Sequence, residues 1–117
     1  MKNVLVLEDD GIAVALLTSL LEESSYSIIT ANNTDEAIAA LSHFSPDIFL
    51  SDWSIPGTVD AREVALQIRS KNPSSQIVFI TGFSPEDLHP NLSDIPNCRI
   101  YQKPVDYDEI ISTLNYP

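Results

Sequence analysis

The chain has 117 residues, which is a typical length for a single domain, and its formal net charge is −11. Its few lysines and arginines are scattered along the sequence, which argues against direct nucleic-acid binding. The apolar run at residues 4–7 is too short for a signal peptide or a membrane span, and Cys98 is the only cysteine, which excludes an internal disulfide. We therefore expect one domain over residues 1–117, located in the cytoplasm and without membrane contact.

Short apolar runs alternate along the chain with segments whose apolar residues recur at helical spacing. In chain order, the sequence predicts a strand at residues 3–7, a helix at 12–23, a strand at 26–30, a helix at 34–42, a strand at 47–51, a helix at 61–71, a strand at 76–81, a short proline-interrupted helix within 85–97, a strand at 98–101 and a helix at 107–114. This alternation predicts an α/β fold: a doubly wound, mostly parallel sheet of five strands with helices on both faces.

The first predicted helix has an apolar stripe at helical spacing, formed by Ile12, Leu16 and Leu20. We expect this stripe to cover one face of the sheet. A second apolar row lies beside it: Ala13, Leu17 and Leu21.

Polar residues that cap helices precede most of the predicted helices. Asp10 fits a cap just before Ile12. Three further helix starts have a capping residue followed three positions later by glutamate: Asn33 with Glu36, Asp60 with Glu63, and Asp106 with Glu109. These pairs predict where the helices begin.

Chemically active side chains follow the predicted strands where each strand ends. They are Glu8, Asp9 and Asp10 after the first strand, Asp52 after the third, Thr81 at the end of the fourth and Lys103 after the fifth. Because parallel strands end at one edge of a sheet, these side chains should converge. Carboxylates so close repel one another unless a cation neutralises them. Oxygen ligands without histidine or cysteine favour Mg²⁺ or Mn²⁺ over zinc.

This set of side chains predicts a site for phosphoryl transfer. Lys103 supplies a positive charge for phosphate oxygens, Thr81 supplies a hydroxyl donor, and one carboxylate can act as nucleophile to form an aspartyl phosphate. Each residue alone also has an ordinary structural explanation. Asp52 has the position of a turn-forming residue, because turn residues follow it, and Lys103 has the position of a solvated surface lysine before Pro104. Their common position at one sheet edge favours the joint interpretation.

Four segments resemble the receiver domains of two-component response regulators: VLVLEDD at residues 4–10, IFLSDWSIPG at 48–57, IVFITG at 77–82 and IYQKP at 100–104. The resemblance extends from residue 4 to about residue 114. It implies a sheet with strand order 2-1-3-4-5. It also implies that Lys103 and Pro104 are joined by a cis peptide bond.

The resemblance also implies a role for each site residue. Asp52 would be the phosphoacceptor, Glu8 and Asp9 an acidic pair with Asp9 a direct metal ligand, and the Ser54 carbonyl another ligand. Thr81 and Lys103 would contact the phosphoryl oxygens, and Tyr101 would match the family's switch aromatic. The implied cofactor is Mg²⁺ or Mn²⁺.

The chain departs from the family pattern in three places. The loop at residues 56–61 is one residue longer than usual and lacks a glycine after Asp60. The predicted fourth and fifth helices are short, and they belong to the region through which receivers usually act on partners.

The resemblance implies a phosphorelay protein that receives its phosphoryl group from a histidine kinase or a histidine phosphotransfer protein and controls a downstream protein partner. It would catalyse only its own phosphorylation and dephosphorylation. Three alternatives remain: a small phosphatase with an aspartyl nucleophile, which would place Asp-x-Asp after the first strand; a flavodoxin-like electron carrier, whose flavin phosphate the acids at residues 8–10 would repel; and a degenerate receiver that serves only as an interaction module.

Overall fold

Five parallel strands form one sheet in the order β2-β1-β3-β4-β5 in the computed structural model, which describes residues 2–84, 86, 92 and 94–115. The elements are β1 (Asn3–Leu7), α1 (Gly11–Glu23), β2 (Ser27–Ala31), α2 (Thr34–Ala40), β3 (Ile48–Asp52), α3 (Ala61–Lys71), β4 (Gln76–Thr81), β5 (Cys98–Gln102) and α5 (Tyr107–Asn115). The predicted fold and strand order are confirmed.

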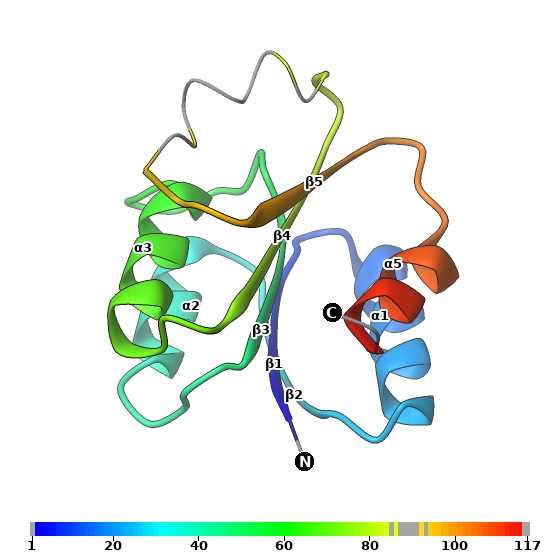
Figure 1. Cartoon of the computed structure of the whole chain (residues 1–117), viewed down its shortest axis with the longest axis horizontal. Helices are drawn as coiled ribbons and strands as arrows, with labels where there is room; N and C mark the ends of the chain where they lie inside the picture. Colours follow the sequence, from blue (N-terminus) through cyan, green and yellow to red (C-terminus); the bar gives the residue numbers. More distant parts are fainter. Residues whose placement is uncertain (1, 85, 87–91, 93, 116–117) are drawn as a thin grey trace.

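The helices cover the two faces of the sheet, with α2 and α3 on one face and α1 and α5 on the other (Figure 1). Alternate residues of each central strand point to opposite faces. In β1, Leu5 and Leu7 join the core under α2 and α3, whereas Val4 and Val6 join the core under α1 and α5. Burial on both faces explains why these strands are continuous apolar runs.

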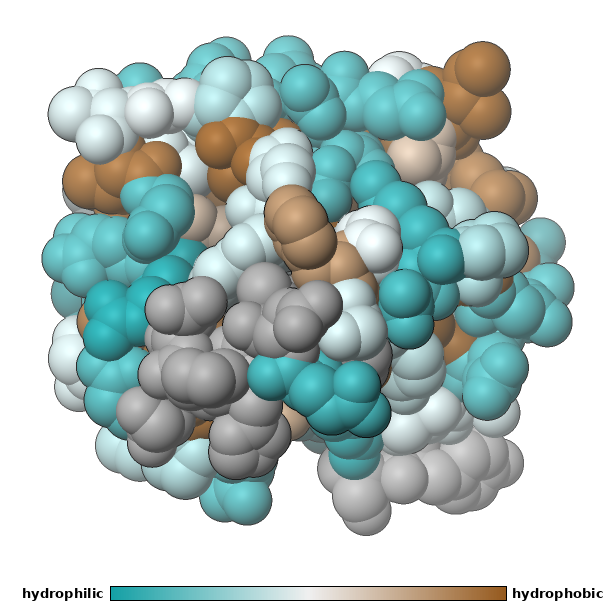
Figure 2. Space-filling view, turned by 90° about the horizontal axis from the view of Figure 1, so that it is seen from above, coloured by the Kyte–Doolittle hydropathy of each residue, from teal (hydrophilic) through white to brown (hydrophobic). Residues whose placement is uncertain are grey.

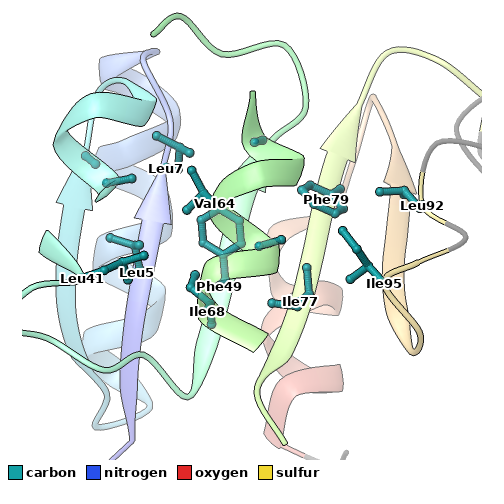
Figure 3. Close-up of a cluster of buried hydrophobic side chains, with 14 residues drawn as sticks. Leu5, Leu7, Leu41, Phe49, Val64, Ile68, Ile77, Phe79, Leu92 and Ile95 are labelled. Atoms are coloured by element: carbon teal, nitrogen blue, oxygen red, sulfur yellow. The ribbon is translucent and has the colours of Figure 1, made fainter. Parts of the chain in front are cut away.

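Aromatic side chains fill the core on the α2 and α3 face. Phe49 of β3 and Phe79 of β4 pack edge to face with ring centroids 6.2 Å apart. Leu92 and Ile95, from the segment between β4 and β5, are buried beside β4 in the same cluster (Figure 3). This packing holds β3 and β4 in a fixed relative position.

The prediction that Ile12, Leu16 and Leu20 form the buried stripe of α1 is wrong for Ile12 and Leu16, whereas Leu20 is half-buried against the core under α1 and α5. Ile12 is 83% exposed and Leu16 is 46% exposed, and the buried residues of this helix are Ala13, Leu17 and Leu21. The two apolar rows differ by one residue, which is a rotation of about 100° around the helix axis. Periodicity identified both rows, but packing on the sheet selected the second one.

Most helix starts lie where the capping residues predict them. The side chains of Asp10, Asn33 and Asp60 accept hydrogen bonds from main-chain N–H groups in the first turns of α1, α2 and α3. At α2 the cap is reciprocal, because Glu36 accepts from the N–H of Asn32 over 2.7 Å.

Element boundaries differ from the prediction by one or two residues. The second and third strands each lie one residue later, the fifth strand is one residue longer, and α2 ends at Ala40. The predicted short helix within residues 85–97 falls largely on residues 85, 87–91 and 93, which lie outside the described residues. None of the helices in the described part of the chain is long and apolar enough to cross a membrane.

Candidate functional site

Three carboxylates meet at the carboxyl ends of β1 and β3. Oxygen atoms of Glu8, Asp9 and Asp52 all lie within 4.8 Å of one another, and the cluster contains no histidine or cysteine. These residues meet because β1 and β3 are neighbouring parallel strands, with Leu7 paired to Ser51. Glu8 is buried and Asp9 is exposed, so the cluster is open to solvent on one side. An all-oxygen ligand set of this kind suits Mg²⁺ or Mn²⁺.

Lys103 adds one positive charge to this cluster. Its Nζ atom lies 3.4 Å from Oδ2 of Asp52, and the side chains of Lys103 and Asp52 are 43% and 11% exposed. A mostly buried carboxylate beside a more exposed ammonium group can be approached from solvent on the lysine side. The peptide bond between Lys103 and Pro104 is cis, as the resemblance implied.

Burial raises the pKa of Glu8 above its ordinary value, and the neighbouring Asp52 carboxylate raises this pKa further. The N–H of Asp9, which donates to Glu8 Oε2 over 3.0 Å, and the charge of Lys103 act in the opposite direction. Negative charge is therefore only partly balanced in the cluster. A divalent cation would complete that balance, so the residues present fit a metal.

Thr81 lies at the end of β4, beside the two segments that contain Asp52 and Lys103. It is 1% exposed, and its hydroxyl oxygen accepts a hydrogen bond from the N–H of Phe83 over 3.1 Å. Its carbonyl oxygen accepts from the N–H of Lys103 over 2.6 Å. The chain that leaves β5 is thus tied to the end of β4, and this contact sets the position of Lys103.

The remaining predicted site residues, Ser54 and Tyr101, are not members of this cluster. Ser54 is exposed in the bend after β3. Tyr101 of β5 is half-buried, pairs with Ile80 in the sheet and packs against the core under α1 and α5. Figure 2 looks onto the edge of the sheet where the strands have their carboxyl ends, and it shows mostly hydrophilic side chains around scattered hydrophobic ones.

The loop after β3 is anchored to the start of α2 through Thr34, a residue that the sequence analysis did not single out. Thr34 is 0% exposed, and its hydroxyl donates to the Val59 carbonyl over 2.7 Å while its N–H donates to the Pro56 carbonyl over 2.9 Å. Gly57 has φ +141°, and a Cβ atom there would lie 1.8 Å from Thr34 Oγ1. These contacts fix the longer loop beside Asp52.

Tyr107, the first residue of α5, is a second neighbour that the sequence analysis missed. Burial raises the pKa of its phenol, and the charge of Glu8 is the next largest cause. Lys103 lowers the same pKa, while Asp10 and Asp52 raise it. The phenol therefore lies within the electrostatic field of the acidic cluster. The sequence signal for this neighbour was its position shortly after Lys103 and Pro104, the segment that contains a predicted site residue.

A family model for the response regulator receiver domain matches residues 4–115. The chain is a response regulator receiver domain. This receiver is 29% identical over 115 residues to the response regulator receiver protein CpdR of Brucella abortus, covering 97% of this chain and 94% of CpdR. It is 39% identical over 80 residues to the transcriptional regulatory protein ResD of Bacillus subtilis, covering 68% of this chain and 32% of ResD. The receiver thus spans nearly all of CpdR but about a third of ResD.

Solved structures show the same fold. The receiver is 30% identical to the response regulator TrrA of Thermotoga maritima in complex with Mg²⁺-BeF, with a TM-score of 0.79 and coverage of 98% of this chain and 97% of TrrA. A receiver protein from Sinorhizobium medicae is 23% identical with a TM-score of 0.87, covering 97% and 91%. Its family places this receiver in two-component phosphorelay signal transduction.

Proposed function

We propose that Asp52 accepts a phosphoryl group from a phosphohistidine on a histidine kinase or a histidine phosphotransfer protein. One Asp52 carboxylate oxygen attacks phosphorus, the bond between phosphorus and the donor imidazole nitrogen breaks, and the imidazole leaves with a proton. The observation that supports this assignment best is the meeting of Glu8, Asp9 and Asp52 within 4.8 Å beside Lys103. We infer that residues 1–117 act as one receiver unit.

We propose that Glu8, Asp9, Asp52 and the Ser54 carbonyl hold Mg²⁺ or Mn²⁺. The bound cation would neutralise charge on the carboxylates and on the phosphoryl oxygens. Support comes from the oxygen-only cluster and from the raised pKa of Glu8, because both indicate carboxylates that gain from a cation.

Lys103 and Thr81 would stabilise the phosphoryl group on Asp52. The Lys103 ammonium already lies 3.4 Å from the Asp52 carboxylate, so it needs little movement to reach a phosphoryl oxygen. The Thr81 hydroxyl accepts a hydrogen bond from Phe83 but donates none to the described residues, which leaves its proton for a phosphoryl oxygen. Apart from forming and hydrolysing its own aspartyl phosphate, this receiver would catalyse no reaction.

The exposed apolar residues of α1 support a surface for the phosphodonor protein. Ile12 and Leu16 are solvent-exposed on a helix that begins directly after the acidic residues 8–10. A donor must bring its imidazole to Asp52, so it must cover the surface around this cluster. Ile12→Asp should therefore slow transfer from a phosphorylated histidine phosphotransfer protein and leave labelling by acetyl phosphate unchanged. Equal slowing with both donors would contradict this surface.

Intact mass measured before and after incubation with acetyl phosphate tests the proposed function. Wild type should gain one phosphoryl mass with Mg²⁺ and none when the metal is removed. Asp52→Asn should gain none, whereas Asp108→Asn, which removes an exposed acid of α5 that is not a member of the cluster, should label like wild type. Labelling of Asp52→Asn, or no labelling of wild type, would overturn the assignment, and the second result would indicate an interaction module without phosphorylation.

A further inference from the structure

A cavity of about 230 Å³ lies at the amino-terminal ends of β4 and β5, at the sheet edge opposite the acidic cluster. Arg69 of α3 and Arg99 of β5 line it, together with Ser75 and Gln76 at the start of β4. None of the described residues that line it is acidic. Two arginines around one cavity make a locally basic site in a chain whose net charge is −11.

Both guanidinium groups are anchored by main-chain carbonyls but keep donors for a ligand. Arg69 donates from Nε to the Ser75 carbonyl over 2.9 Å and from Nη1 to the Pro96 carbonyl over 2.5 Å. Arg99 donates from Nη1 to the Thr113 carbonyl over 3.3 Å. A guanidinium has five N–H donors, so each arginine has N–H groups that no described residue uses. Anchored arginines lose little further side-chain freedom when they bind an oxyanion.

Two polar atoms beside these arginines make no hydrogen bond to any described residue. They are Ser75 Oγ and Gln76 Oε1, and both are buried. Ser75 is 3% exposed as a whole residue. An unpaired buried polar atom destabilises the fold, because it has lost its hydrogen bonds to water and gained none in the protein. Rotation of the Ser75 hydroxyl toward a bound oxyanion would break no hydrogen bond to a described residue, so this hydroxyl can donate to such a ligand. Gln76 Oε1 only accepts hydrogen bonds and therefore does not bind the oxyanion itself.

We propose that this cavity binds a small oxyanion, the phosphoryl or carboxylate group of a small molecule, through Arg69, Arg99 and Ser75. The cavity is separate from the phosphorylation site. β4 runs from Gln76 at the cavity to Thr81 at the acidic cluster, a distance of roughly 16 Å at about 3.3 Å per residue. The two sites share no residue, so both can be occupied at once.

Nuclear magnetic resonance titration of the metal-free full chain tests this proposal. Sodium phosphate and sodium succinate are added in separate series at constant pH, with sodium chloride holding the ionic strength constant. Amide signals of Ser75, Gln76 and Arg99 should shift and saturate in at least one series. Saturation with phosphate alone would assign a phosphoryl ligand, and saturation with succinate alone would assign a carboxylate ligand.

Two variants and a control locate the binding. Arg99→Gln should weaken the saturating anion at least tenfold, and Ser75→Ala should weaken it severalfold. Lys2→Gln removes the same charge outside the cavity and should leave the affinity unchanged. If Arg99→Gln does not fold, the anion affinity of Ser75→Ala alone tests the proposal. Shifts that do not saturate in either series, or wild-type affinity in both folded variants, would overturn the proposal.

Discussion

The ammonium nitrogen of Lys103 lies 3.4 Å from Oδ2 of Asp52, so the lysine already occupies part of the space that a cation and a phosphoryl group would share. This ion pair has opposite consequences for metal binding and for phosphoryl transfer. The lysine competes with a divalent cation for Asp52 in the unphosphorylated receiver, but it stabilises the negative charge of the phosphoryl group during transfer.

Lys103→Gln should therefore tighten Mg²⁺ binding by up to about fivefold, the range expected for a partly exposed ion pair, and slow phosphorylation by about a hundredfold or more. Fluorescence of Trp53, the only tryptophan and the residue after Asp52, can report metal binding, and intact mass can report labelling. Lys71→Gln removes a lysine that donates to the Leu41 carbonyl and should change neither quantity. Weaker Mg²⁺ binding in Lys103→Gln would contradict the competition.

Asp9→Ala should abolish the stabilisation of the receiver by Mg²⁺. A ligand that binds only the native state at a hundred times its Kd adds about 2.7 kcal/mol to the free energy of unfolding. Asp10→Asn is a matched control, because it removes an adjacent charge and retains a side chain that can cap α1 through Ile12. Thermal unfolding with and without Mg²⁺ measures the stabilisation by the metal in Asp9→Ala and in Asp10→Asn. An equal rise in melting temperature for wild type and Asp9→Ala would remove Asp9 from the ligand set.

Glu8→Gln should stabilise the metal-free receiver at neutral pH and not at acidic pH. The pKa of Glu8 is raised in the fold by burial and by Asp52, so the native state holds its proton more tightly than the unfolded state. The resulting stability is fully present below the ordinary pKa of Glu8 and is lost as pH rises through the raised value. The melting-temperature difference between Glu8→Gln and wild type should grow from about pH 4 to about pH 7. A melting-temperature difference that shrinks as the pH rises over this interval would contradict the raised pKa of Glu8.

Gly57→Ala should destabilise the receiver by about 2 kcal/mol or more, because its backbone has φ +141° and the new Cβ would collide with Thr34. The same change should lower the rate of labelling at Asp52, since the loop after β3 would lose its anchor at α2. Gly11→Ala has no atom within 4 Å of the added Cβ and serves as the control. Denaturant unfolding gives the free energies, and full stability of Gly57→Ala would show that the loop moves freely from Thr34.

Thr81→Ala should uncouple phosphorylation from the proposed switch while still accepting phosphate. The Thr81 hydroxyl would follow a phosphoryl oxygen, and Tyr101 on the adjacent strand would then rotate inward beside β4. Amide hydrogen exchange over residues 84–102, with and without beryllofluoride, should change in wild type and in Thr81→Ser but not in Thr81→Ala. The same protection in free and bound wild type would assign signalling to another surface.

Local patterns in the sequence were sufficient for the order of elements and for the position of the acids. Continuous apolar runs that alternate with helices predict parallel strands that end at one edge of the sheet, which is where Glu8 and Asp52 lie. The neighbouring positions of β1 and β3 were implied by the family resemblance and not by a local pattern. Caps such as Asn33 act within one helical turn, which is why they predicted helix starts correctly. The roles of the site residues in chemistry remain predictions.

Contacts between segments distant in sequence determined the buried face of α1, the anchor of the loop after β3 and the raised pKa of Glu8. Ile12 and Leu17 are equally apolar, and only packing of α1 on the sheet exposes one and buries the other. The hydrogen bonds from Thr34 to the carbonyls of Pro56 and Val59 join residues far apart in sequence, so no local pattern predicts this anchor. The raised pKa of Glu8 depends on burial and on the distance to Asp52, and both arise only when the strands pair. Periodicity depends on neighbours in the chain, whereas burial, close approach and electrostatics depend on neighbours in space.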